Sequence, residues 1–194
     1  MDITTAISDA VSLDLITHVV RSDIGMRREE NQDSFTIIEG EGFKFFVVAD
    51  GMGGVKGGAE ASQLAAVVLA QCLKSKNSIT DEDIVSAVNR VNTAIFERGI
   101  EKPEYAGMGT TLVGLCFLGS NFYVVNVGDS RAYRIREGGI TQLTEDHTLV
   151  TELLRSGAID ESQVENHPVS HMLTRSLGPT PIVDVDCRLE TSAA

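Results

Sequence analysis

An uncharged stretch from Ala106 to Gly128 restricts the possible folds of this chain. Its length alone would allow one helix to span a membrane. However, Gly-Ser-Asn at 119–121 interrupts the stretch, and several other glycine and threonine residues lie within it. Two neighbouring core strands joined by a tight turn explain this pattern better. The sequence therefore predicts strands at 110–118 and 122–128 and no membrane span.

Apolar periodicity predicts the other elements. A spacing of three to four residues indicates helices at 59–74 and 81–98, and "TDED" at 80–83 is typical of a capping box. We also expect a short helix near 149–157, and strands at 14–20, 34–38, 43–49, 131–137, 140–144 and 183–190. The order of strands, two helices and strands predicts an α+β fold in which helices pack on antiparallel sheet.

The last expected strand, 183–190, alternates between apolar and polar residues. This alternation places Asp184 and Asp186 on the solvent face, so neither is predicted as a ligand. The inward positions are Val183, Val185, Cys187 and Leu189. Elsewhere, His147 is predicted to have a structural hydrogen-bonding role, and Arg131 and Arg175 are expected to pair with nearby acidic side chains.

Charge and cysteine usage narrow the class of protein. A chain of 194 residues is long enough for one domain with its own core. A net charge of −12 argues against binding to nucleic acid or to an anionic membrane. The three scattered cysteines are typical of reduced thiols, and the amino-terminal residues lack the pattern of a signal peptide. These features predict a cytoplasmic protein.

The stretch "VVADGMGG" at 47–54 places Asp50 at the end of an apolar strand and follows it with glycines. Glycines after a strand are typical of phosphate-binding loops, but neither the dinucleotide-binding pattern nor the Walker pattern fits these residues. One remaining interpretation is a metal site, in which the Asp50 carboxylate and the Gly51 carbonyl offer the oxygen ligands that Mg²⁺ and Mn²⁺ prefer. The other is a simple strand-to-helix turn.

Two further aspartates lie beside predicted strands. Asp33 immediately precedes one strand, and Asp129 lies in a turn between two others. If these strands pair, the carboxylates of Asp33, Asp50 and Asp129 could converge at one edge of the sheet, where they would repel each other without cations between them. Arg28 lies five residues before Asp33 and could offer its planar guanidinium to a phosphate group.

Six motifs occur in an order that resembles the PPM (type 2C) family of metal-dependent serine/threonine protein phosphatases, most closely its bacterial single-domain branch. They are "GMRREENQDSF", "VVADGMGG", "GMGTTLVGL", "VVNVGDSRAYRI", "LTEDHTLV" and "LTRSLG". The resemblance implies two antiparallel sheets packed as a sandwich and flanked by helices. It divides the chain into an amino-terminal extension, 1–13, and a phosphatase domain, 14–194, with a flap at about 147–176.

The same resemblance implies a site that holds two Mn²⁺ or Mg²⁺ ions and a water that bridges them. The position of Asp50 bridges both ions, the Gly51 carbonyl binds one of them, and Asp33 holds an ion or its water. Asp129 would belong to a third, weaker metal site, and Arg28 would hold the substrate phosphate. Phosphorylated proteins are the implied partners, with a cognate serine/threonine kinase as the opposing enzyme and the chain acting as a monomer.

Two departures from the family pattern favour a second hypothesis, a degenerate module that binds phosphoproteins without hydrolysing them. A later Asp-Gly and an Asp-Asn, each expected to supply a metal ligand, do not occur, so the domain is expected to lack its last strands. Many family members also carry a histidine after the second motif that is thought to protonate the leaving group. Val55 occupies this position and cannot act as a general acid, and the adjacent Lys56 is more simply a solvated lysine.

Overall fold

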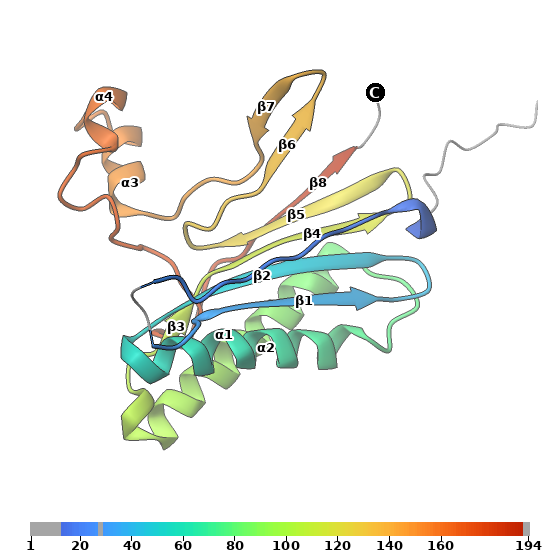
Figure 1. Cartoon of the computed structure of the whole chain (residues 1–194), viewed down its shortest axis with the longest axis horizontal. Coiled ribbons are helices and arrows are strands. Elements are labelled where there is room, and N and C mark those ends of the chain that lie inside the picture. Colours follow the sequence, from blue (N-terminus) through green and yellow to red (C-terminus); the bar gives the residue numbers. More distant parts are fainter. Residues whose placement is uncertain (1–12, 27–28, 192–194) are drawn as a thin grey trace, which may run out of the picture.

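The computed structural model of the chain describes residues 13–26 and 29–191, without the side chains at positions 55 and 56. An antiparallel sheet forms its centre (Figure 1), with strand order β1-β2-β4-β5-β8 and the short β3 paired with the end of β2. The strands are β1 (Asp33–Glu39), β2 (Lys44–Met52), β3 (Gly109–Thr110), β4 (Leu112–Leu118), β5 (Asn121–Val127) and β8 (Asp186–Thr191). The uncharged stretch therefore forms neighbouring strands, as predicted.

Two long helices, α1 (Gly54–Leu73) and α2 (Asp81–Glu101), cover one face of this sheet (Figure 1). Alternate residues of β2 point toward the helices, and Phe45, Val47 and Ala49 are buried there. They pack in one core with buried residues of the helices, among them Leu69 and Ile95. Each large apolar side chain contributes about 1.5–3 kcal/mol when it is fully buried, so packing in this helix–sheet layer stabilises the fold.

The start of α2 confirms the predicted capping box. The Thr80 hydroxyl accepts from the backbone N–H of Asp83, and the Asp83 carboxylate accepts from the backbone N–H of Thr80. Asp83 also accepts from Lys76, 2.6 Å away, and these hydrogen bonds lower its pKa. By contrast, α1 begins five residues before the predicted position 59, since three of these five residues are glycines, which carry no apolar signal.

A two-stranded hairpin, β6 (Tyr133–Arg136) and β7 (Gly139–Gln142), lies over the opposite face of the main sheet (Figure 1). At its base, Leu143 packs with Phe122 and Val124 of β5 in a second, smaller apolar cluster. This arrangement of antiparallel sheets with helices on one side confirms the predicted α+β fold class. Within residues 13–26 and 29–191, the second sheet consists of this hairpin alone.

The prediction of a strand at 14–20 is wrong. The short 3₁₀ helix Leu13–Leu15 is followed by an extended segment that pairs with no strand among the described residues. Val19 is almost fully exposed there, and the segment touches the sheet where the His18 ring packs on Phe46, with centroids 5.3 Å apart. A strand needs a hydrogen-bonded neighbour as well as apolar, β-branched residues, and within the described residues this segment has only the second.

The last strand is shorter than predicted, because β8 begins at Asp186 rather than at 183. Val183 is buried as predicted, whereas Leu189 is 54% exposed, so the inward alternation fails toward the end of the strand. β8 lies at the edge of the sheet and pairs only with β5 in the part of the chain that the structure describes. Its outer residues therefore lack a neighbouring strand that would cover them.

The segment 147–176 leaves the sheet and returns to it (Figure 1). It contains the predicted short helix α3 (Leu149–Arg155) and an unpredicted one, α4 (Glu161–Val164). Its two ends are held together by an isolated bridge between Thr148 and Leu173. A second bridge joins Leu177 to Thr110, the last residue of β3. No helix among the described residues is both long and apolar enough to cross a membrane.

Candidate functional site

Asp33 and Asp50 lie directly opposite each other in the antiparallel pair of β1 and β2. Side chains at such positions point to the same face of a sheet, with Cβ atoms about 4.5–5.5 Å apart. Both residues are exposed, on the face that the helices do not cover. The strand pairing thus brings two of the predicted carboxylates together, although β2 continues past Asp50 to Met52 instead of ending there.

The backbone of Asp50 is fixed by two threonines, Thr110 at the end of β3 and Thr111 between β3 and β4. Its N–H donates to Thr111 Oγ1 at 3.0 Å, and its carbonyl accepts from the Thr110 hydroxyl and the Thr111 N–H, both at 2.9 Å. Both threonines are almost fully buried. Because backbone and side-chain bonds act together here, Asp50 is anchored on both sides of its Cα, which restricts the direction of its carboxylate.

Gly51 is required by close packing rather than by an unusual backbone angle. A Cβ at this position would lie 1.9 Å from the carbonyl oxygen of Gly58 and 2.8 Å from that of Gln32. The N–H of Gly51 also donates to the Gln32 carbonyl. Since both neighbours are backbone atoms, no side chain at 51 can be accommodated without separating β2 from α1. The glycine therefore holds the carboxylate pair close to the amino end of α1.

The amino end of α1 forms the next wall of the site. Gly53 precedes the helix with φ at 117°, in the region that only glycine adopts readily, and a Cβ there would lie 2.7 Å from the Met108 Cα. The Gln32 amide donates to the carbonyl of Gly54. Unsatisfied N–H groups and the helix dipole favour negative charge at a helix amino end. The end of α1 is therefore a favourable neighbour for the two carboxylates and for an anion.

Asp129 lies beyond the end of β5, at the same end of the sheet. The neighbouring Ser130 hydroxyl lies 2.7 Å from Thr111 Oγ1, the atom that also binds the Asp50 backbone. One threonine therefore connects the Asp50 strand to the Asp129 turn. A cavity of about 630 Å³ opens beside Asp129 and is bordered on its other side by residues of α3 and α4.

The three predicted aspartates share one end of the sheet but do not form one ligand cluster. Across residues 13–26 and 29–191, no group of three or more His, Cys, Asp or Glu side chains is arranged to hold a metal ion. Asp33 and Asp50 form a pair, and Asp129 lies in the adjoining turn. Arg28 falls outside the described residues, as do the side chains of Val55 and Lys56, so predictions on these residues stay predictions.

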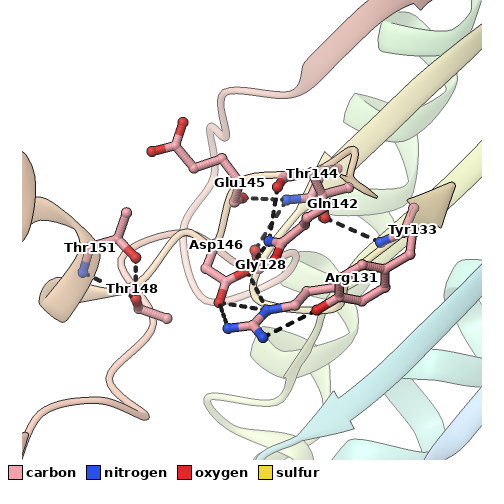
Figure 2. A network of polar contacts seen from close by, with 11 residues as sticks. Gly128, Arg131, Tyr133, Gln142, Thr144, Glu145, Asp146, Thr148 and Thr151 are labelled. Carbon is pink, nitrogen blue, oxygen red and sulfur yellow. Dashed lines mark hydrogen bonds and ion pairs between the residues drawn. The ribbon is translucent and has the colours of Figure 1, made fainter. Parts of the chain in front are cut away.

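Figure 2 shows a polar network around Arg131 and Asp146, beside the Asp129 turn. The Arg131 guanidinium donates from two nitrogens to Asp146, at distances of 2.5–2.9 Å, and a third contact reaches the Tyr133 hydroxyl. Gln142 donates to the other side of the network, to Asp146 and to the Thr144 carbonyl. The predicted pairing of Arg131 with an acid is confirmed, and these bonds raise the pKa of Arg131.

Asp186 has a role that the sequence pattern did not predict. Its carboxylate accepts from Arg175 at 2.7 Å, and its second oxygen lies 3.2 Å from His147 Nε2. Partial burial acts to raise the pKa of Asp186, but the hydrogen bonds from His147 and Arg175 outweigh it, and the pKa is lowered. Alternation correctly placed Asp186 on the outer face, but it could not show that two side chains from other segments cover that position.

Comparisons with known proteins agree with this geometry. A family model described as Protein phosphatase 2C matches residues 26–172. That match covers most of the chain, so the chain belongs to the protein phosphatase 2C family. The family assignment confirms the resemblance identified from the six motifs.

Individual relatives and solved structures show the same family similarity. The chain is 38% identical over 172 residues to "Serine/threonine phosphatase stp" of Listeria welshimeri, a match that covers 86% of this chain and 68% of the relative. It is 34% identical to "Serine/threonine protein phosphatase PstP" of Mycobacterium tuberculosis over 84% of this chain and 31% of that protein. The crystal structure of Staphylococcus aureus Stp1 superimposes with a TM-score of 0.82 at 30% identity, covering 87% of this chain and 68% of Stp1.

Proposed function

We propose that this chain is a metal-dependent protein phosphatase that removes phosphate from phosphoserine and phosphothreonine in proteins. The observation that carries the proposal is the direct pairing of Asp33 with Asp50 in a chain of the protein phosphatase 2C family. The names of the Listeria and Mycobacterium relatives support the class of substrate. A phosphorylated protein, and a kinase that phosphorylates it, are the partners that this activity requires.

The side chains at the proposed centre suit a hard divalent cation. Two carboxylates on opposing residues repel each other, and a cation between them removes the repulsion. We infer that Asp33, Asp50 and the Gly51 carbonyl hold two Mn²⁺ or Mg²⁺ ions, with Asp129 serving a third, weaker site. When bound, the two ions supply an activated water as the nucleophile and neutralise the phosphate oxygens.

The chain's own residues would bind and orient the phosphate. The amino end of α1 lies beside Asp50 and favours an anion. Arg28 is proposed to bind two phosphate oxygens through its planar guanidinium. The flap at 147–176 borders the cavity beside Asp129 and is proposed to contact the protein that carries the phosphate. No side-chain nucleophile is required by this arrangement.

Phosphate release from a phosphothreonine peptide, followed as Mn²⁺ is added, tests the proposal. We expect hydrolysis that depends on Mn²⁺ and falls more than roughly 100-fold in Asp50→Asn, because even residues that only orient metal ligands contribute about 10- to 100-fold. The matched control is Asp184→Asn, an exposed aspartate outside the site, which should keep its activity. Hydrolysis that persists in Asp50→Asn would show that the site is wrongly placed.

The second candidate function is a module that binds phosphoproteins without cleaving them. It is favoured by Val55 at the position of the expected general acid and by the lack of a three-ligand group among the described residues. The same titration separates the two functions if binding of the peptide is measured alongside phosphate release. Saturable binding of the phosphopeptide but not of its unphosphorylated form, without release of phosphate, would favour the binding module.

A further inference from the structure

His147 is a buried residue at the point where the Asp129 turn, the flap and β8 meet. Its side chain is only 4% exposed. Its backbone N–H donates to the Gly128 carbonyl at 3.0 Å, and its carbonyl accepts from the N–H of Thr174 at 2.9 Å. The first bond reaches the turn that carries Asp129, and the second joins the two ends of the flap. His147 therefore connects the candidate site to the flap through its backbone alone.

The imidazole ring of His147 adds a second pair of contacts. Its Nδ1 accepts from the backbone N–H of Gly128 at 3.0 Å, and its Nε2 lies 3.2 Å from an Asp186 oxygen. Because Nδ1 accepts a hydrogen bond, the neutral ring carries its own hydrogen on Nε2, from which it donates a hydrogen bond to Asp186. Arg175 holds the other Asp186 oxygen at 2.7 Å. Each ring nitrogen thus has one partner that matches its role.

Gly128 is the residue through which His147 acts on Asp129. Gly128 has φ at 111°, and a Cβ there would lie 2.6 Å from Thr111 Cγ2. Its N–H and its carbonyl both bind His147, and the carbonyl also accepts from the buried Asn126 amide. A glycine in this region of backbone angles has weak conformational preferences of its own. The contacts around Gly128 therefore determine the direction in which the chain enters Asp129.

We propose that His147 is a positioning residue that fixes the Asp129 turn through Gly128, while Asp186 and Arg175 hold the far side of its ring. The consequence for metal binding rests on the proposed function, in which Asp129 is a ligand. The positioning itself does not depend on that function, since every contact that carries it lies between residues of this chain.

Two substitutions separate the two sides of the ring. The side-chain oxygen of His147→Asn lies at the position of Nδ1 and can still accept from Gly128, but it does not reach Asp186. The side-chain amide of His147→Gln reaches the position of Nε2 but removes the acceptor for Gly128. Exchange of the Gly128 amide hydrogen with solvent, measured by NMR, should stay slow in the His147→Asn variant. It should accelerate roughly three- to tenfold in the His147→Gln variant, the range expected for one hydrogen bond.

A second measurement follows Mn²⁺ through the paramagnetic broadening of the Asp129 amide resonance, which requires no turnover. The Mn²⁺ concentration at half-saturation should rise roughly three- to tenfold in the His147→Gln variant. In the His147→Asn variant it should remain within about twofold of the value for the unchanged chain. Asp186→Ala removes the acceptor that keeps the ring hydrogen on Nε2, so Nδ1 no longer accepts from Gly128 in every molecule, and Gly128 exchange should accelerate, but less than in His147→Gln. The His147→Asn variant does not need Asp186 for this, because its amide oxygen is always an acceptor. Asp184→Ala, on the neighbouring outward position, is the control and should change neither measurement.

Equal exchange of Gly128 in the Asn and Gln variants would overturn the proposal, since a residue that only fills space loses packing in both. If the buried substitutions prevent folding, Asp186→Ala decides the question, and an unchanged Gly128 exchange rate in that variant would also overturn the proposal. A chain that hydrolyses no phosphopeptide would contradict the proposed function. The difference between Asn and Gln in amide exchange would still support the positioning role.

Discussion

Thr111 Oγ1 lies 2.7 Å from Ser130 Oγ, and through this contact the strand that carries Asp50 is joined to the turn that carries Asp129. The same Thr111 oxygen accepts from the Asp50 backbone. Thr111 is only 3% exposed, so water cannot replace these two hydrogen-bond partners of its hydroxyl. A single buried side chain therefore couples the positions of two candidate metal ligands.

Replacing Thr111 with valine tests this coupling. The change preserves the shape of the side chain and removes the oxygen, which leaves the Asp50 N–H and the Ser130 hydroxyl without that partner. We expect the free energy of unfolding in urea to fall by about 1–3 kcal/mol. Thr93→Val on the exposed face of α2 is the control and should stay within about 0.5 kcal/mol of the unchanged chain. Equal effects of the two changes would contradict the coupling.

Gly51→Ala adds only one methyl group but should strongly destabilise the fold. The added methyl group would lie 1.9 Å from the backbone of Gly58, so β2 and α1 must separate. We expect a loss of about 3 kcal/mol or more in thermal or chemical unfolding, at the upper end for overpacked cores. Gly139→Ala in β7 is a matched control, because the nearest atom there is 3.4 Å from the added Cβ. A stable Gly51→Ala variant would show that the two elements are not tightly packed.

The lowered pKa of Asp186 predicts a stability that depends on pH. A carboxyl group whose pKa is lower in the folded than in the unfolded chain stabilises the fold when it is ionised. This stabilisation is complete above the usual value of 3.8 and is lost as the pH falls through the lower pKa of the folded state. Asp186→Asn should therefore destabilise the chain at pH 7, and the difference from the unchanged chain should shrink in acid. Unfolding curves from pH 7 to below 3.8 measure this, and a constant difference would contradict it.

Cys116 should resist thiol reagents while the chain is folded. Burial raises its pKa to about 12, with a smaller contribution from Cys187, so almost no reactive thiolate exists at pH 8. We expect iodoacetamide to leave Cys116 unmodified in the native chain and to modify it once urea unfolds the core. Peptide mass spectrometry distinguishes Cys116 from the half-buried Cys72 and Cys187. Rapid modification of Cys116 under native conditions would show that β4 is not part of a closed core.

The sequence by itself determined the elements whose signal is local. The capping pattern at Thr80, the helical spacing along 81–98 and the Gly-Ser-Asn turn between two core strands each depend on residues close together in the chain, and the structure confirms all three. The six ordered motifs likewise identified the family before any geometry was known. Local backbone preferences and side-chain periodicity are properties of short segments, so they can be interpreted without knowledge of distant contacts.

Only the tertiary structure decided which residues meet. The register of β1 on β2 places Asp33 opposite Asp50, and a shift of one residue would have sent the two side chains to opposite faces. The contact between His147 and Asp186 joins residues 39 positions apart, and periodicity alone described Asp186 as a solvated surface residue. The segment 14–20 has the apolar composition of a strand, but among the described residues it pairs with no strand. Strand pairing and the partners of a polar side chain depend on long-range contacts, and no short stretch of sequence specifies them.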